Sequence, residues 1–285
     1  MPTKSYKNIK IKRKKKHPFL IKVIAAVIGS ALCGTILLET PIWGTVILIS
    51  FASGMTGFEM SAATGLVKSR FLQIISVSMS AAVPWMIYFG VDETVRIVIL
   101  FVFIITVFMY SVFFRTETEL IEILTGIFAA FVFPLILSLF IVIIKGKNGR
   151  ILVLLPLIIA WMCDAFSQII GMKLGKHKLI ERISPNKTIE GFFGGIVGSL
   201  IGVTIYAVIL HLSGVSVHLL VLLLTGFVGA LLSAVGDLSL SFIKRKCGIK
   251  DYGCLIPEHG GVLDRFDSVI FVLPLCVVTG RFIIG

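Results

Sequence analysis

The chain has 285 residues, of which 57% are hydrophobic and only 15% are charged, and its mean hydropathy is +1.03. This composition excludes an ordinary soluble globular protein and indicates a polytopic membrane protein. The net charge is +12, but nine of the 27 lysines and arginines fall between Lys4 and Lys22. Such a basic tail is a topology signal and a contact for anionic membrane lipids, and no aromatic-interleaved basic surface accompanies it. We therefore expect no nucleic-acid partner.

The apolar segments predict an all-α fold with about nine transmembrane helices, because a hydrocarbon core of about 30 Å needs about 20 apolar residues per helix. The predicted spans are 19–38, 42–57, 72–90, 95–114, 123–144, 151–172, 192–212, 217–240 and 269–284. The positive-inside rule places the basic tail in the cytoplasm, and alternation then places loops 173–191 and 241–268 on the same side. The basic loop 145–150 violates the rule in this arrangement.

Polar residues divide the chain into three parts. Residues 1–18 form the basic cytoplasmic tail, and residues 19–150 form N-terminal transmembrane helices with short charged connections. Residues 151–285 carry most of the polar groups within and between spans, so we expect the catalytic region there. Asp164 lies well inside the predicted span 151–172. A carboxylate at that depth is costly unless it faces protein, a partner or water, so Asp164 marks either a functional site or a helix–helix hydrogen bond.

The loop after that span contains two polar motifs, Gly175-Lys-His-Lys178 and Ser184-Pro-Asn-Lys-Thr-Ile-Glu-Gly191. Ser184 before Pro185 predicts the N-cap and first residue of the next helix, whose free N–H groups would bind an anion. Lys187 and Thr188 would lie in or beside the first turn of that helix, with Glu190 just beyond it. The alternative is a solvated basic turn between two helices.

The stretch 241–268 interrupts the apolar pattern with clustered charges and glycines. It contains the cations Lys244, Arg245, Lys246, Lys250 and Arg265, the acids Asp251, Asp264 and Asp267, and His259 followed by Gly260 and Gly261. Clustered lysine and arginine match phosphate, and carboxylates suit a hard cation such as Mg²⁺. Glycines allow a ligand to approach the backbone closely. The stretch therefore predicts a phosphate-handling, metal-dependent site at a membrane surface.

Three aspartates are the candidate metal ligands. Asp237 lies at the end of the predicted span 217–240, and Asp264 and Asp267 are three residues apart, so they would share one face of a helix. Carboxylates that converge among cations are tolerable when a metal ion lies between them. Asp267 has a second interpretation as an acid stabilised by the helix dipole.

The neighbouring cations and the histidine also have two interpretations each. Lys244 and Arg245 either bind phosphate or extend along the lipid interface. His259 could act as an acid or base, but a phosphate monoester is already anionic and needs little deprotonation. We therefore interpret His259 as a hydrogen-bond donor to phosphate.

These motifs resemble the signature of the phosphatidate cytidylyltransferases (CDP-diacylglycerol synthases), over about residues 160–268. The signature residues are Ser241, Lys244, Arg245, Lys250, Asp251, Gly253, Pro257, His259, Gly260, Gly261, Asp264, Arg265 and Asp267, together with the two motifs of loop 173–191. The resemblance implies that phosphatidic acid attacks the α-phosphorus of CTP at a membrane site facing the cytoplasm, giving CDP-diacylglycerol and pyrophosphate. Glu181 and Glu258 depart from the family pattern, which has proline and glycine there.

The resemblance also implies roles for particular residues. Mg²⁺ would be bound by Asp237 and Asp264 with support from Asp267, and Lys187 and Lys244 would act beside them in catalysis. The substrates would contact Ser184, Lys176, Thr188, Glu190, Arg245, Lys250, Asp251, His259, Gly260, Gly261 and Arg265. A second cation and a homodimer are expected only by analogy with the family.

Two other functions remain open at this point. A secondary transporter for an anionic metabolite would also have acids inside its spans, but it predicts two related halves, and none are visible in the sequence. The same chemistry on an isoprenoid-ether phosphate is a further alternative, because acyl and prenyl tails would both contact undifferentiated Leu, Val and Phe.

Overall fold

The computed structural model describes residues 29, 31–115, 117–253, 255 and 260–284. In this part of the chain, eight helical segments are long and apolar enough to cross a membrane. They are Ile42–Ala63, Arg70–Tyr88, Glu93–Phe114, Leu120–Lys145, Gly149–Leu174, Ile189–Leu212, Leu219–Lys246 and Leu263–Ile283. These confirm the all-α polytopic fold and eight of the predicted spans. The predicted span 19–38 lies mainly outside the described residues, and its end belongs to the helical residues 31–39.

The first half of the described chain is built from helices α2 to α7. They are α2 (Ile42–Phe58), the π-helical turn η1 (Glu59–Ala63), α3 (Arg70–Tyr88), α4 (Glu93–Phe114), α5 (Leu120–Leu137), α6 (Leu139–Lys145) and α7 (Gly149–Leu152). The second half contains α8 (Leu155–Leu174), β1 (Lys178–Ile180), β2 (Ser184–Thr188), α9 (Ile189–Leu212), α10 (Leu219–Lys246) and α11 (Leu263–Ile283).

The segment after α8 forms an antiparallel hairpin, in which Lys178 pairs with Thr188 and Ile180 pairs with Ser184. The predicted helix start at Ser184 is therefore wrong. Helix α9 begins only at Ile189, where the Oγ1 of Thr188 accepts a hydrogen bond of 3.1 Å from the N–H of Gly191. Proline at position 185 suits an edge strand as well as a first helical turn, because its missing N–H is tolerated in both.

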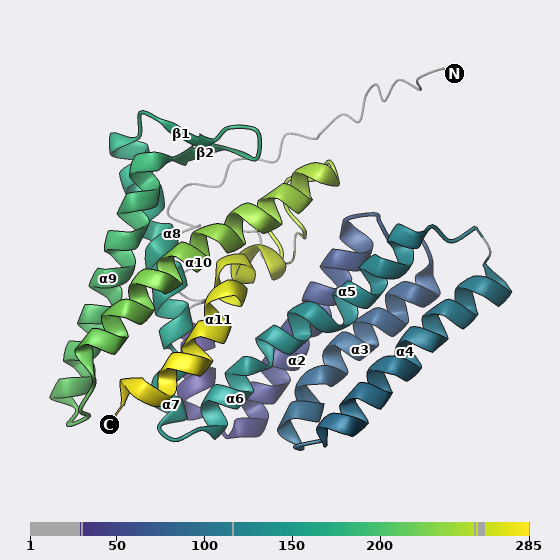
Figure 1. Ribbon diagram of the computed structural model, residues 1–285, viewed down its shortest axis with the longest axis horizontal. Helices are drawn as coiled ribbons and strands as arrows, with labels where there is room; N and C mark the ends of the chain where they lie inside the picture. The colour runs from purple at the N-terminus through teal and green to yellow at the C-terminus, as the bar shows by residue number, and fades with distance from the viewer. Residues whose placement is uncertain (1–28, 30, 116, 254, 256–259, 285) are drawn as a thin grey trace.

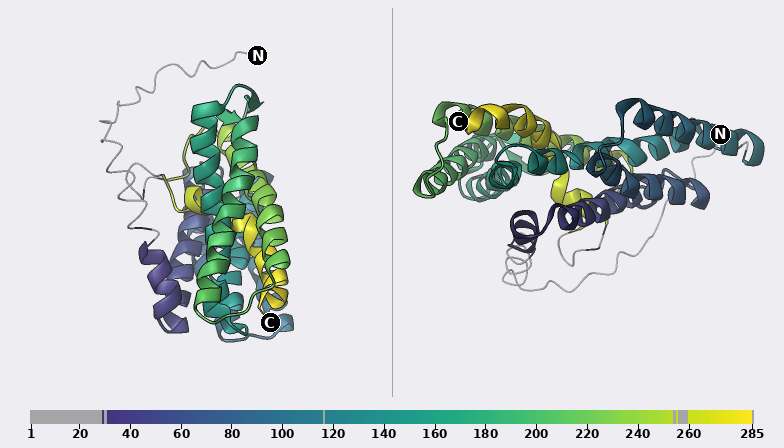
Figure 2. Two further views of the ribbon diagram at one scale, coloured as in Figure 1. Left: turned by 90° about the vertical axis from the view of Figure 1, so that its left-hand side faces the viewer. Right: turned by 90° about the horizontal axis from the view of Figure 1, so that it is seen from below.

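The helices gather in two clusters that meet at α11 (Figures 1 and 2). Helices α2 to α5 form one cluster, and α8, α9 and α10 form the other, while α11 packs against α5, α6, α8 and α10. Helices α8 and α9 approach each other closely at glycines of α9: a Cβ on Gly198 would lie 2.8 Å from the carbonyl oxygen of Met162. Small residues permit such close packing, which is how helices associate where lipid removes the hydrophobic driving force.

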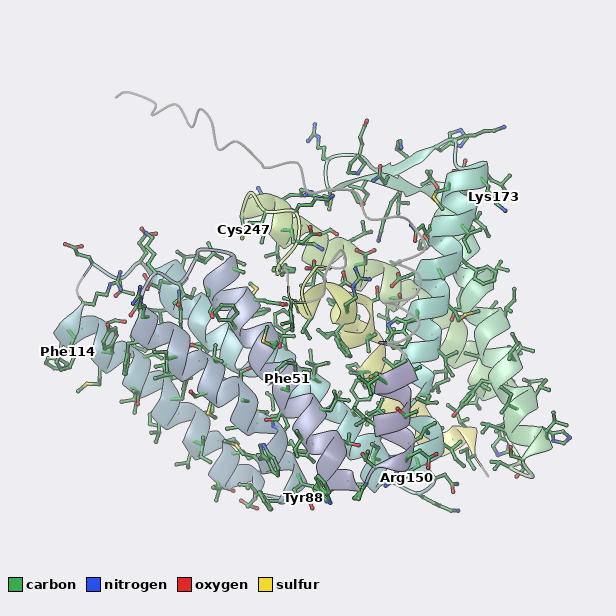
Figure 3. All side chains as sticks on the ribbon, turned by 180° about the vertical axis from the view of Figure 1, so that it is seen from behind. Phe51, Tyr88, Phe114, Arg150, Lys173 and Cys247 are labelled. Carbon is green, nitrogen blue, oxygen red and sulfur yellow. The ribbon has the colours of Figure 1, made fainter. Side chains whose placement is uncertain are left out.

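The two polar loops lie at the same end of the bundle. In Figure 3, Lys173 and Cys247 lie at one end and Tyr88 and Arg150 lie at the other. We call the first of these the polar end, which carries β1, β2 and the C-terminus of α10. The prediction that loops 173–191 and 241–268 lie on one side of the membrane is therefore confirmed for their described residues. The orientation of this side toward the cytoplasm stays a prediction.

Two cations of loop 145–150 lie at the opposite end and bind backbone carbonyl groups. The Nη2 of Arg150 donates to the carbonyl oxygen of Thr40 at 2.7 Å, and its Nη1 donates to that of Leu38. The Nζ of Lys145 donates to the carbonyl oxygen of Ile87 at 3.2 Å. These carbonyl groups lie at the C-terminal ends of the helical residues 31–39 and of α3, where the last carbonyl groups of a helix have no partner within it. The loop therefore has a structural reason to be basic despite the positive-inside rule.

We expect Arg150→Met to lower the stability of the protein. The substitution leaves two helix-terminal carbonyl groups without their donor, which costs about 1–3 kcal/mol for a buried group. The measurement is the thermal unfolding midpoint in detergent, with Lys147→Met as the control because Lys147 is an exposed cation in the same loop. Equal midpoints for the two variants would contradict a specific role for Arg150.

Candidate active site

Asp237 of α10 forms the first part of the site, together with the hairpin. Its carboxylate makes an ion pair with Lys187 of β2 and accepts a hydrogen bond of 3.2 Å from the Oγ of Ser241. The Nε of Arg245 donates to the carbonyl oxygen of Ile183 at 3.2 Å, so the hairpin is attached to α10 at two points. The structure thus brings together two segments that the sequence separates by about fifty residues.

Asp264, in the first turn of α11, forms the second part. Its Oδ1 accepts from the Nζ of Lys244 at 2.8 Å, and its Oδ2 accepts from the N–H groups of Tyr252 and Gly261 at 2.8 and 2.9 Å. The Lys244 and Asp264 side chains are only 10% and 5% exposed. Lys244 therefore does not extend along the lipid interface but is buried against an acid.

Asp164, Asp237 and Asp267 belong to three different helices and lie close enough to feel one another's charge. The Oγ of Ser268 donates to the Oδ1 of Asp164 at 3.3 Å, and the N–H of Ser268 donates to the Oδ1 of Asp267 at 2.8 Å. The positive charges of Lys187, Lys244 and Arg265 act on this group of acids. The intramembrane Asp164 is thus part of the same charged region, and it also makes the helix–helix hydrogen bond of the alternative interpretation.

This region has the donor chemistry for a hard cation. Carboxylate oxygens from α10 and α11 converge among apolar helices, where a divalent ion would offset their mutual repulsion. Among the described residues, however, no three His, Cys, Asp or Glu side chains already stand in a metal-binding arrangement. Both oxygens of Asp264 are engaged with Lys244 and the backbone. Asp237, Asp264 and Asp267 therefore stay predicted ligands that would have to exchange partners to bind a metal.

The hairpin residues have mixed surroundings. Glu190 fastens the start of α9 to the start of the hairpin, because its Oε1 lies 2.7 Å from the Nδ1 of His177 and both its oxygens lie 3.3 Å from the N–H of His177. Thr188 is buried as the N-cap of α9. Ser184 is half-buried in β2, and Lys176 is exposed just before β1.

The remaining predicted residues lie around Asp264. Lys250 and Asp251 are exposed between α10 and α11, and Arg265 is exposed in the first turn of α11. Gly260 has φ +87°, and a Cβ there would lie 2.8 Å from the Oδ2 of Asp264, so both backbone conformation and space require glycine. Gly261 is buried and donates to Asp264. His259 and Glu258 lie outside the described residues, and their interpretations stay predictions.

Tyr252 is a residue of the site that sequence reasoning missed. Its ring is fully buried, with the Nζ of Lys244 5.5 Å from the ring centre, and its hydroxyl donates to the carbonyl oxygen of Leu240 at 3.0 Å. Burial raises the pKa of the Tyr252 phenol, so the hydroxyl remains a donor. The one tyrosine of the charged, glycine-containing stretch 241–268 was the available signal.

Glu59 is the second missed residue. It is 1% exposed, and its carboxylate accepts hydrogen bonds of 2.8 and 2.7 Å from the N–H groups of Val262 and Leu263. The only sequence signal was an acid directly after the apolar span 42–57. That position alone points to no partner, because Val262 and Leu263 are 203 and 204 residues away.

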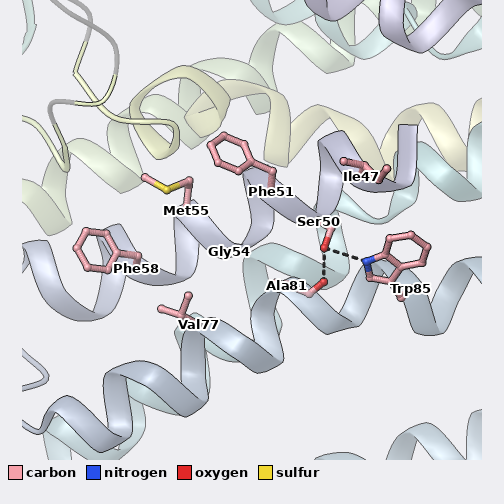
Figure 4. Close-up of a pocket in the computed structure, with 9 residues that line it drawn as sticks. All are labelled: Ile47, Ser50, Phe51, Gly54, Met55, Phe58, Val77, Ala81 and Trp85. Carbon is pink, nitrogen blue, oxygen red and sulfur yellow. Dashed lines mark hydrogen bonds between the residues drawn. The ribbon is translucent and has the colours of Figure 1, made fainter. Parts of the chain in front are cut away.

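An apolar groove of about 550 Å³, whose lining contains no charged residue, lies between α2 and α3 (Figure 4). It is lined by Ile47, Ser50, Phe51, Gly54, Met55, Phe58, Val77, Ala81 and Trp85. The Oγ of Ser50, which accepts a hydrogen bond of 3.2 Å from the Nε1 of Trp85, is already used within the lining. This groove suits a hydrocarbon chain and has no group that would bind phosphate.

Comparisons with known proteins identify the family to which the chain belongs. The model of the cytidylyltransferase family matches residues 20–283. Similar curated proteins include a phosphatidate cytidylyltransferase of Staphylococcus haemolyticus (strain JCSC1435), 44% identical over 129 residues, and one of Staphylococcus aureus (strain COL), 43% identical over 129 residues. Each alignment covers 45% of this chain and 48% of the relative, so the chain spans about half the length of the curated relatives it matches. Because the family match extends over nearly all of the sequence, the chain belongs to the cytidylyltransferase family.

Proposed function

We propose that this protein transfers the cytidylyl group of CTP to phosphatidic acid, forming CDP-diacylglycerol and pyrophosphate at the cytoplasmic side of a cell membrane. The observation that carries the proposal is the arrangement at the polar end, where two lysine–aspartate ion pairs lie beside further acids between apolar spans. A substrate with charged phosphates and apolar chains suits that boundary. The family and the names of the curated relatives point to the same reaction.

The two ion pairs suggest how the site would receive its substrates. In this arrangement Lys187 neutralises Asp237, and Lys244 neutralises Asp264. Phosphate groups would compete with the carboxylates for both lysines, because a lysine ammonium binds phosphate as a compact point charge. The carboxylates released in this way, with Asp267 beside them, would hold Mg²⁺. When bound, Mg²⁺ would supply positive charge to the phosphate oxygens. A second cation is a further proposal of the same kind.

The chain's own residues would then position the reactants. The phosphate of phosphatidic acid is already an anion and needs no strong base; its oxygen forms a bond to the α-phosphorus of CTP as the bond to pyrophosphate breaks. Such transfer depends mainly on alignment and charge stabilisation. We assign the remaining phosphate and nucleotide contacts to residues in or beside the hairpin, at the C-terminal end of α10, and in the segment that leads into the first turn of α11. These contacts are Ser184, Lys176, Thr188, Glu190, Arg245, Lys250, Asp251, His259, Gly260, Gly261 and Arg265.

The test is lipid labelling by purified protein in detergent with phosphatidic acid, in the presence and absence of Mg²⁺. We expect label from the α-phosphorus of CTP to enter a chloroform-soluble product only when both are present. Label from the γ-phosphorus should stay in the aqueous phase, which distinguishes cytidylyl transfer from lipid phosphorylation. A parallel reaction with an isoprenoid-ether phosphate tests the lipid class. No lipid product with either acceptor would contradict the proposal.

A further inference from the structure

Glu59 connects the N-terminal cluster of helices to the segment that carries Asp264. It is the first residue of η1, where α2 passes into a π-helical turn. Its Oε1 accepts from the N–H of Val262, and its Oε2 accepts from the N–H of Leu263. The first N–H groups of a helix have no partner within that helix, so Glu59 caps α11 from another part of the chain.

Two glycines enclose the Glu59 carboxylate. A Cβ on Gly253 would lie 2.5 Å from the Oε1 of Glu59, and a Cβ on Gly261 would overlap the carboxylate itself. The carboxylate is thus held between Gly253 and Gly261, two points of the connection between α10 and α11. This close fit means that Glu59 determines where the segment can lie, in addition to satisfying two N–H groups.

Glu59 and Asp264 divide three consecutive N–H groups between them. Gly261 donates to Asp264, and the next two residues, Val262 and Leu263, donate to Glu59. Asp264 in turn binds Lys244. A shift of the backbone at 261–263 would therefore move Asp264, Lys244 and the first turn of α11 together.

We propose that Glu59 is a positioning residue for the transfer site, acting through the backbone of residues 261–263 on Asp264 and Asp267. The inference rests on the proposed function, and it assigns the N-terminal helices a part in catalysis. The π-helical turn supports it, because such an inserted residue is frequently found at functional sites. A misplacement of catalytic groups by about 1 Å is enough to reduce turnover strongly.

Glu122 provides a matched control within the same chain. It is a buried glutamate of α5 whose Oε1 accepts from the N–H groups of Lys68 and Ser69 at 3.0 and 2.7 Å, at the start of α3. Both glutamates accept hydrogen bonds from backbone N–H groups, but the backbone that Glu122 holds carries no residue of the candidate site. Replacement by glutamine makes the same chemical change at both positions, since it removes the negative charge and replaces one acceptor oxygen by an NH₂ donor.

The experiment compares Glu59→Gln and Glu122→Gln in the full-length protein in detergent, by hydrogen–deuterium exchange and by the labelling assay. We expect Glu59→Gln to increase amide exchange in residues 260–266 and to lower kcat about 10–100-fold, with a smaller change in the KM for CTP. Glu122→Gln should increase exchange near residues 66–72 and keep the kcat of the unsubstituted protein. Glu59→Asp retains both carboxylate oxygens on a shorter side chain. Its exchange in residues 260–266 and its kcat should lie between those of Glu59→Gln and Glu122→Gln.

The outcomes separate this inference from the proposed function. Faster exchange at 260–266 with unchanged kcat would overturn the positioning role, and so would a lower kcat with unchanged exchange. Equal losses of kcat in both glutamine variants would also overturn it, because a general loss of stability would then explain them. If Glu59→Gln does not fold, the same comparison between Glu59→Asp and Glu122→Asp decides. An unsubstituted protein that makes no lipid product contradicts the proposed function, while exchange still reports whether Glu59 holds α11.

Discussion

Replacing Asp264 by asparagine should reduce cytidylyl transfer by about 1,000-fold or more. The carboxylate lies where three donors meet, from Lys244, Tyr252 and Gly261. Asparagine can still accept from the two backbone N–H groups, but it carries no charge for Lys244 or for a metal ion. Loss of a single electrostatic group at a transfer site costs about 100–1,000-fold, and loss of a metal ligand adds to this. The measurement is the initial rate of lipid labelling from CTP.

The single substitution also leaves the buried Lys244 without its negatively charged partner, so the control must separate an effect on folding from an effect on catalysis. Lys244 would remain in a site that exposes 10% of its side chain, and breaking a buried ion pair costs about 3–5 kcal/mol. The double variant Asp264→Asn, Lys244→Met removes the stranded charge. We expect the double variant to recover much of the thermal stability and to stay inactive. A double variant that recovers activity along with stability would show that Asp264 serves only to neutralise Lys244.

The spans could be predicted from the sequence because the membrane imposes a length and a composition on each helix. All eight described spans overlap the predicted ones, and α5 with α6 follows the predicted span 123–144 despite the break at Ser138. The hairpin could not be predicted in this way. Ser184 and Pro185 fit a helix start or an edge strand equally well, and pairing with β1 decided between them.

The candidate site could be predicted as a set of residues but not as a set of contacts. Charged residues within apolar sequence stand out, so Asp237, Lys187, Lys244 and Asp264 were identified. Which lysine binds which acid depends on how α8 to α11 pack, and sequence spacing does not contain that information. Glu59 is the extreme case, because both of its hydrogen bonds come from backbone N–H groups, and no side chain in the sequence marks those groups as partners.

Lys187→Met should lower kcat about 100–1,000-fold, the cost of removing one charged group that stabilises the reacting phosphates. The substitution also leaves Asp237 without its ion-pair partner beside Asp164 and Asp267, so repulsion among the acids increases. The hairpin should stay attached to α10 through Arg245 and Ile183, so the fold around the site should persist. The measurements are kcat in the labelling assay and the thermal unfolding midpoint.

The control for this variant is Lys178→Met, which removes the same charge from β1 of the same hairpin. Lys178 is exposed, and its Nζ donates to the carbonyl oxygen of Pro185 at 2.7 Å, so it holds the hairpin without touching an acid of the site. We expect this control to keep most of the turnover. If both variants lose turnover equally, the basic charge of the hairpin as a whole attracts the substrate, and the pair with Asp237 has no special part. If Lys187→Met lowers only the unfolding midpoint, the pair is a structural attachment between β2 and α10. The proposal that substrate phosphate replaces the Asp237 carboxylate on Lys187 requires a loss of kcat in Lys187→Met that Lys178→Met does not share.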